Sequence, residues 1–132
     1  MKKLLFFTFT LLITFVSSAT SQNYYDESDP VYKVVEQKPE FPGGDKELFK
    51  YVQATIKYPT EAYEQKIEGR VIVQFVVEKD GSISDVKVVR KIHPLLDAEA
   101  VRLVENMPKW QPGTQRGKIV RVQYTLPISF KI

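Results

Sequence analysis

The last fifteen residues of the chain, "KIVRVQYTLPISFKI" (residues 118–132), decide how the rest of the fold is interpreted. From Val120 onward, apolar side chains occupy every second position and mostly polar ones fill the gaps. A period of two is typical of a β-strand with one buried face and one face in water. The stretch is also much longer than the average strand of about five or six residues. We therefore expect a long final strand, part of which lacks a neighbouring strand within the chain.

Pro127 interrupts this strand and indicates where the strand lies in its sheet. Proline has no N–H to donate, so within a sheet it is confined to an edge or to a bend. An edge of this kind is either protected against pairing, here by Arg121, Lys131 and the proline itself, or used to recruit a strand from elsewhere. The sequence predicts the edge and leaves both of its uses open.

Three segments upstream have the spacing of helices. Residues 45–57 place apolar side chains four positions apart, after a start at Gly44 or Asp45. Residues 59–67 predict a short second helix, with Pro59 suited to its first turn. Residues 94–107 carry a longer apolar stripe and are followed by Pro108, which predicts the third helix.

Residues 69–91 complete the set of elements. They contain two β-branched runs around Asp80-Gly81, which predicts a hairpin. The apolar positions change parity after Ile83, so we expect a β-bulge near Ser84-Asp85. Together the elements predict an α+β fold, with a three-stranded antiparallel sheet and two main helices packed on one face, plus a short extra helix. The other face of the sheet is left comparatively open.

The N-terminus has the pattern of a targeting segment. An apolar run covers residues 4–16 and small residues follow it, which predicts a secretory signal peptide over residues 1–21. A short uncleaved anchor is the alternative, although the run is shorter than a membrane-spanning helix. Residues 22–43 are polar and acidic with a Pro-Gly-Gly end, and we interpret them as a tether or linker that contains one short edge strand. Residues 44–132 form the predicted domain.

Composition argues against several classes of function. The chain carries 19 basic and 16 acidic residues, and Lys2 and Lys3 belong to the targeting segment, so the exported part is close to neutral. No basic patch of the kind that nucleic-acid binders carry is present. The chain has no Cys and a single histidine, His93, which fits a turn residue at a helix start better than a metal ligand or a catalytic base. We therefore expect no enzyme activity, no metal site and no cofactor.

Two aromatic side chains allow two interpretations each. Trp110 lies in a loop, between Lys109 and Gln111, and either covers the core or is exposed as an anchor for a partner. Tyr58 precedes Pro59 and has the same two interpretations. Core packing is favoured for both side chains, because an aromatic residue in a loop more often closes the core below it.

Four stretches, taken together, resemble the C-terminal domain of TonB-family energy transducers, in the form common among Bacteroidetes. They are "EFPGG" (residues 40–44), "IKYPTEAYEQKIEGRVIVQFVVEKDGSISDVKVVR" (56–90), "PLLDAEAVRLVENMPKWQPG" (94–113) and "VQYTLPISF" (122–130). The order and spacing match that family, and each piece alone is a weak signal. The resemblance implies the same α+β fold that the patterns predict.

The resemblance also implies a function. Domains of this family bind TonB-dependent outer-membrane transporters in the periplasm, where a segment of the transporter adds a strand to the last strand of the domain. Energy-coupled transmembrane transport depends on that contact. Carried onto this chain, the implied partner-binding residues are Tyr58, Pro59, Ile119, Arg121, Gln123, Thr125 and Ser129.

Some features differ from the family pattern. Family transducers have a full membrane helix and a Pro-rich spacer, whereas here the apolar run is short and the spacer contains few prolines. An inner-membrane proton-driven motor complex is therefore expected as a partner only if the N-terminus stays uncleaved. Lys66 stands where the family often has glycine, so it is expected to adopt a positive φ. The alternative function is a secreted assembly module that forms a homodimer through its C-terminal edge strand.

Overall fold

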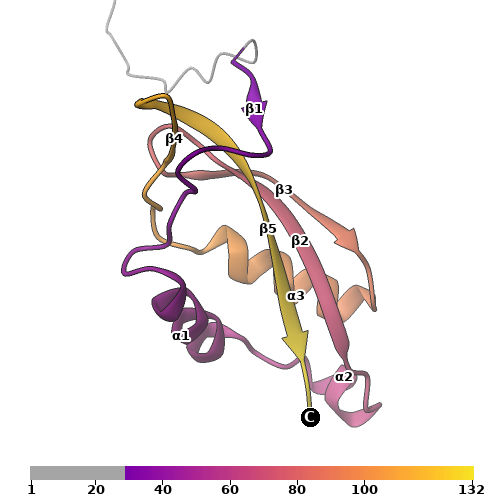
Figure 1. Cartoon of the computed structure of the whole chain (residues 1–132). Helices are drawn as coiled ribbons and strands as arrows, with labels where there is room; N and C mark the ends of the chain where they lie inside the picture. Colours follow the sequence, from indigo (N-terminus) through magenta and orange to yellow (C-terminus); the bar gives the residue numbers. More distant parts are fainter. Residues whose placement is uncertain (1–28) are drawn as a thin grey trace, which may run out of the picture.

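The computed structural model describes residues 29–132, and the predicted signal peptide lies outside the described residues (Figure 1). Within residues 29–132 no helix is both long and apolar enough to cross a membrane. The elements, in chain order, are β1 (Val31–Tyr32), α1 (Asp45–Thr55), α2 (Thr60–Glu64), β2 (Gly69–Val77), β3 (Ile83–Arg90), α3 (Pro94–Glu105), β4 (Gly113–Gln115) and β5 (Lys118–Phe130).

The centre of the sheet is the antiparallel set of β3, β2 and β5, as the sequence predicts. The final strand β5 is 13 residues long and pairs with β2 without a break from Val77↔Val122 to Gly69↔Phe130. The complete strand order is β1-β5-β2-β3, with β4 paired to the start of β5. The α+β fold class is thus confirmed, and two short strands, β1 and β4, extend the predicted sheet.

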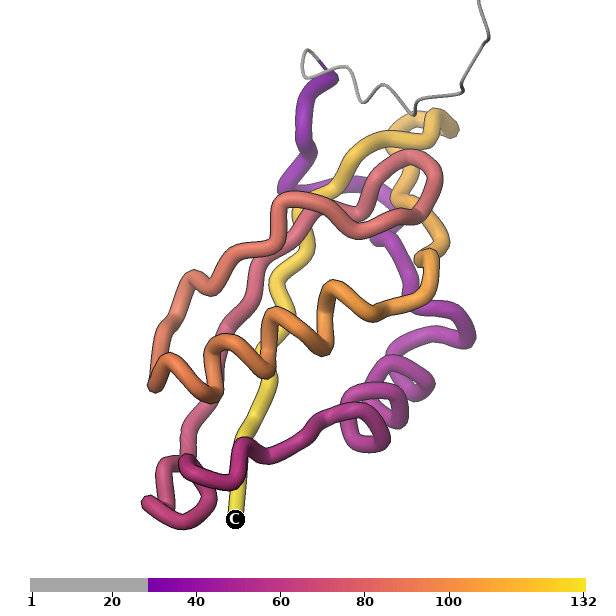
Figure 2. The backbone as a smooth tube through the Cα atoms, turned by 180° about the vertical axis from the view of Figure 1, so that it is seen from behind, coloured from indigo at the N-terminus to yellow at the C-terminus, as the bar shows by residue number. Residues whose placement is uncertain are grey.

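Helix α3 covers one face of the sheet, and α1 lies beside its β5 edge. In Figure 2, which shows the molecule from behind, α3 lies in front of the central strands, and α1 lies beyond β5 on the side away from β3. Alternate side chains of β2, including Val73 and Phe75, are fully buried, and so are Leu96 and Leu103 of α3. Trp110 packs edge-on against Phe75 at a centroid distance of 5.4 Å and belongs to the same cluster. The prediction that this tryptophan covers the core is confirmed.

The β2–β3 hairpin turns at Gly81, whose φ is +86°. A Cβ at this position would lie 2.0 Å from the carbonyl oxygen of Trp110, so the turn requires glycine for steric reasons as well. The register of the hairpin shifts between Gln74 and Val76, opposite Asp85, which has a φ of +48°. This irregularity is the β-bulge that the change in parity predicts.

Part of the segment interpreted as a tether packs against the domain. Val31–Tyr32 form β1, which pairs in parallel with Arg121 and Val122 of β5. Farther along, Gln37 forms an isolated bridge with Thr114, and Phe41 is buried in the core cluster. The chain therefore contacts β5 well before the first helix begins.

A polar clamp fixes α1 against α3. The carboxylate of Glu99 accepts hydrogen bonds from the Arg102 guanidinium and from the backbone N–H of Lys57, and Arg102 also donates to the carbonyl of Thr55 at 3.1 Å. Burial by itself raises the pKa of Glu99, but the hydrogen bonds from Arg102 and Lys57 outweigh it, and the pKa lies below its ordinary value. The C-terminal end of α1 is held in place as a result.

Helices α2 and α3 are both shorter than the segments predicted for them. α2 covers five residues, and Pro59 precedes it as the N-cap instead of lying in its first turn. For α3, His93 is the N-cap, and its Nδ1 accepts a hydrogen bond from the N–H of Leu95 at 3.2 Å. His93 therefore serves as the predicted residue at the helix start.

Lys66 lies just after the C-cap of α2 and has a φ of +55°, which confirms the expectation of a positive φ. Lys66→Gly is predicted to raise the free energy of unfolding by about 1 kcal/mol, because the left-handed conformation is strained for a residue with a Cβ. Urea denaturation measures the change. Lys66→Ala is the matched control, since it removes the same side chain and keeps the Cβ, and it should give no gain. Equal stability of the two variants would contradict the prediction.

Candidate partner-binding edge

β5 has a strand on both sides only near its start. The side away from β2 is covered by β1 at Arg121 and Val122, and β4 pairs with Lys118–Val120. From Gln123 to Phe130, β2 is the sole strand that pairs with β5 within residues 29–132. We call the side of Gln123–Phe130 that points away from β2 the free edge.

Pro127 indicates which backbone groups lie on the free edge. The N–H and C=O of one residue in an antiparallel strand point to the same side, and successive residues alternate. The ladder with β2 continues through Ile72↔Pro127, and proline has no N–H to contribute to it. Pro127 therefore fits an outward-facing position, so that Gln123, Thr125 and Ser129 also direct their N–H and C=O groups outward. The free edge then offers three N–H donors and four C=O acceptors.

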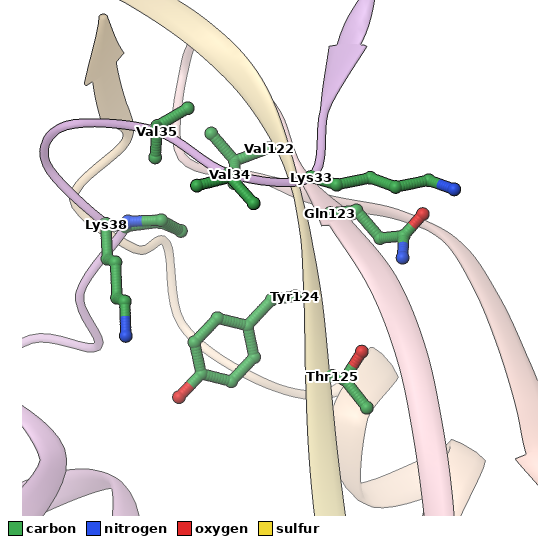
Figure 3. A pocket seen from close by; sticks show the side chains of 9 residues that line it. Lys33, Val34, Val35, Lys38, Val122, Gln123, Tyr124 and Thr125 are labelled. Carbon is green, nitrogen blue, oxygen red and sulfur yellow. The ribbon is translucent and has the colours of Figure 1, made fainter.

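A hollow opens beside the start of the free edge (Figure 3). Residues from Lys33 to Pro39, just after β1, line one wall, and Val122–Thr125 of β5 line the other. Figure 3 shows Lys38 and Tyr124 on one side of β5 and Lys33 and Gln123 on the other. Burial, and to a smaller extent the carboxylate of Asp45, raise the pKa of the Tyr124 hydroxyl. Two lysines are thus placed next to the point where the unpaired part of β5 begins.

The structure brings together most, though not all, of the residues implied by the family resemblance. Gln123, Thr125 and Ser129 lie along the free edge, with Thr125 and Ser129 exposed. Tyr58 lies at the far end of the edge, where its ring packs edge-on against Phe130 at a centroid distance of 5.7 Å and its hydroxyl donates to the carbonyl of Ile67. Core packing of Tyr58 is thus observed, and Pro59 follows it, half-buried.

Ile119 is separate from this group. It is 52% exposed and pairs with Thr114 of β4, at the opposite end of β5 from Tyr58. Its side chain is therefore exposed to solvent, but its position on β5 already pairs with β4.

The residues 29–132 include no group of three or more His, Cys, Asp or Glu side chains arranged to hold a metal ion. The chemistry of this surface is instead that of unpaired backbone groups, with apolar and lysine side chains beside them.

Comparison with known proteins assigns the chain to a family. The sequence profile of the family described as "Gram-negative bacterial TonB protein C-terminal" matches residues 54–132. The chain belongs to this family. The protein TonB of Pseudomonas aeruginosa is 39% identical over 77 residues, which are 57% of this chain and 22% of that protein. This TonB C-terminal domain therefore corresponds to about a fifth of the length of the curated relative.

Two solved structures are also similar. The solution structure of the P. aeruginosa TonB C-terminal domain has 35% identity and a TM-score of 0.48, and the match covers 58% of this chain and 77% of that one. The Helicobacter pylori TonB C-terminal domain (residues 194–285) has 24% identity and a TM-score of 0.49, with coverage of 65% and 90%.

In this TonB C-terminal domain, Arg121 makes an internal ion pair. Its side chain is 15% exposed, and its Nε lies 2.7 Å from the Glu78 carboxylate, which is 1% exposed. The hydroxyl of Ser84 donates to the same carboxylate, and the Arg121 guanidinium also donates to the carbonyl of Asp29 at 2.9 Å. The ion pair, above all the hydrogen bond from Arg121 to Glu78, raises the pKa of Arg121. The guanidinium is therefore occupied by contacts within the domain.

Sequence reasoning did not find the role of Glu78, although one signal was available. Glu78 follows the alternating strand "GRVIVQFVV" directly, and it lies on the same face of the sheet as Arg121, one position beyond the pair Val77↔Val122. Side chains of opposite charge in adjacent cross-strand positions are expected to pair. This pairing depends on the register between β2 and β5, which the sequence alone does not determine.

Arg121→Met is predicted to lower the free energy of unfolding by about 3 kcal/mol, because it leaves the buried Glu78 carboxylate without its partner. The double variant Arg121→Met/Glu78→Leu should recover most of that loss, since both charges are then absent. Urea denaturation of the two single variants and the double variant forms a complete cycle. A double variant as unstable as the sum of the single variants would show that the two charges do not depend on each other.

Proposed function

We propose that this protein is a non-enzymatic binding domain that captures an extended segment of a TonB-dependent outer-membrane transporter by strand addition to the free edge of β5. This binding takes place in the periplasm, after export directed by the N-terminal segment. It supports energy-coupled transport across the outer membrane. Membership of the TonB C-terminal family supports the choice of partner. The observation that carries the proposal is the stretch Gln123–Phe130, which pairs with β2 alone.

The edge has the chemistry that strand addition needs. Backbone hydrogen bonds give affinity in this mode of recognition, and flanking side chains give specificity. β1 already pairs with the neighbouring positions Arg121 and Val122, so this side of β5 accepts an additional strand. An isolated two-residue strand contributes little by itself, and the eight positions that follow offer a longer ladder.

Strand addition predicts an alternating response to changes in the peptide backbone. Synthetic peptides from the N-terminal segments of transporters of the same bacterium are methylated at one backbone nitrogen at a time. Methylation of a nitrogen that faces β5 should weaken binding at least about tenfold, because it removes a hydrogen bond and adds bulk at the edge. Methylation at the next residue, whose N–H faces away, should have little effect. Fluorescence anisotropy gives the affinity of each peptide.

The unmethylated peptide supplies the map of the site. Added to isotope-labelled protein, it should shift the backbone amide signals of residues 123–130, except Pro127, which has no N–H, and leave those of β3 largely unchanged. If no transporter peptide shifts these amides, or if methylation weakens binding equally at consecutive positions, strand addition at this edge is wrong.

The same free edge favours one alternative, a dimer in which two copies of β5 pair with each other. Pro127 and Lys131 oppose it, because two such strands would bring two prolines and two lysines into one ladder. Sedimentation at several concentrations decides between the two, since a tight dimer would leave no edge for a transporter. N-terminal sequencing of the protein from its host tests whether an inner-membrane motor complex is a partner. A mature start near Gln22 excludes direct coupling through a membrane anchor.

A further inference from the structure

Helix α1 extends past the sheet on the side of the free edge. Both views place it beyond β5, away from β2 and β3 (Figures 1 and 2). Its apolar side is only half covered, because Leu48 is 6% exposed while the adjacent Phe49 is 65% exposed. A large apolar side chain that is exposed beside an unpaired strand is typical of a site where a partner binds. Here the partner would add a strand next to β5.

Two connected hollows follow the line between α1 and β5. The first, of about 260 Å³, is lined by Leu48, Phe49 and Val52 of α1 and by Tyr124 and Leu126 of β5. The second lies farther along and shares Val52, Gln53 and Ser129 with the first, and its lining continues to the C-terminal end of β5. The remaining residues of the second hollow are Ile56, Tyr58, Phe130 and Lys131. We call the two hollows together the edge groove.

A strand added to the free edge would lie directly over this groove. Its successive side chains would alternate between the helix side and the open face, with about 6.6 to 6.8 Å between neighbours on one side. Side chains on the helix side would enter an apolar groove beside Phe49 and Leu126. Those on the open face would lie next to polar residues such as Thr125.

Charge further defines the occupant. Lys38 stands on the Tyr124 side of β5 at one end, and Lys131 lines the groove at the other end. Both lysines are exposed, so they favour acidic side chains at the two ends of a bound segment, whereas Asp45, which lines the first hollow, disfavours an acidic side chain within the groove. A second copy of β5 has the required alternation but brings Lys118 and Lys131 of its own, which these lysines would repel.

We infer that the edge groove selects its partner by side-chain pattern: an extended segment with apolar residues at every second position, polar residues between them, and acidic residues at its ends. This inference rests on the proposed function and adds a rule for which segments bind. Phe49, which the resemblance does not implicate, becomes a specificity-determining residue.

The test uses two designed peptides of identical composition. One alternates Val and Ser over six positions and carries Glu at both ends, and the other groups the three Val and the three Ser in separate blocks. The alternating peptide should bind the full domain at least about tenfold more tightly, because it alone places every Val on the helix side. Replacing its Glu residues by Lys should weaken binding and reverse the dependence on salt.

Phe49→Ser provides the second arm, with Val89→Ser as the matched control. Val89 is 50% exposed on β3, at the opposite edge of the sheet. Phe49→Ser should weaken binding of the alternating peptide roughly 5- to 20-fold, since it removes apolar area that the peptide would cover. Phe49→Leu should retain most of the affinity, and Val89→Ser should retain all of it. Amide spectra of the free variants check that each one is folded.

The outcomes separate this inference from the proposed function. If transporter peptides bind the free edge while the two designed peptides bind equally and Phe49→Ser has no effect, the pattern rule is wrong and strand addition stands. If no peptide of any kind binds the edge, both are wrong. If sedimentation shows a stable dimer that Phe49→Ser dissociates, the groove is occupied by a second copy, which overturns the inference.

Discussion

The ladder between β2 and β5 is the interaction on which the remaining structure depends. It joins nine consecutive residue pairs without a bulge, and its alternate side chains supply much of the core. A backbone strand has two sides, however, and this ladder satisfies only one of them. Every N–H and C=O on the other side of β5 must find β1, water or a visiting chain. The long final strand is thus held by an unbroken ladder on one side and, from Gln123 to Phe130, pairs with no strand of residues 29–132 on the other.

The ion pair between Arg121 and Glu78 connects this ladder to the N-terminal segment. Arg121 reaches across to the strand next to its own and also donates to the carbonyl of Asp29, two residues before β1. Lys79 adds a more exposed contact to the carboxylate of Asp29. A buried charged pair contributes little net stability compared with apolar residues, but it penalises any register in which its partners are separated. The ion pair therefore favours one register of β5 with β2. The contacts of Arg121 and Lys79 with Asp29 also hold the segment before β1 in place.

Much of the fold could be predicted from the sequence because it depends on local periodicity. The alternation in β5, the Asp-Gly turn of the hairpin and the helical spacing of α1 and α3 each require only neighbouring residues. Pro127 predicted the edge, since a missing N–H has the same consequence in any sheet. The contacts that could not be predicted are all tertiary: the burial of Glu78, the pairing of β1 with Arg121 and the position of α1 beyond the sheet. Arg121 illustrates the difference, because its place on the polar face was evident and the contacts of its guanidinium were not.

The placement of β1 has a mechanical consequence for the proposed function. The segment that leads back to the N-terminus joins β5 at Arg121 and Val122, and the free edge begins at the next residue along the same strand. Tension between the N-terminal segment and a captured peptide would thus be carried by β5 itself and would not cross the helices. Along a strand, the hydrogen bonds of an added peptide lie perpendicular to the pull and share the load together. β1 pairs through only two residues, so its ladder is much shorter than the one that the free edge offers to a captured peptide.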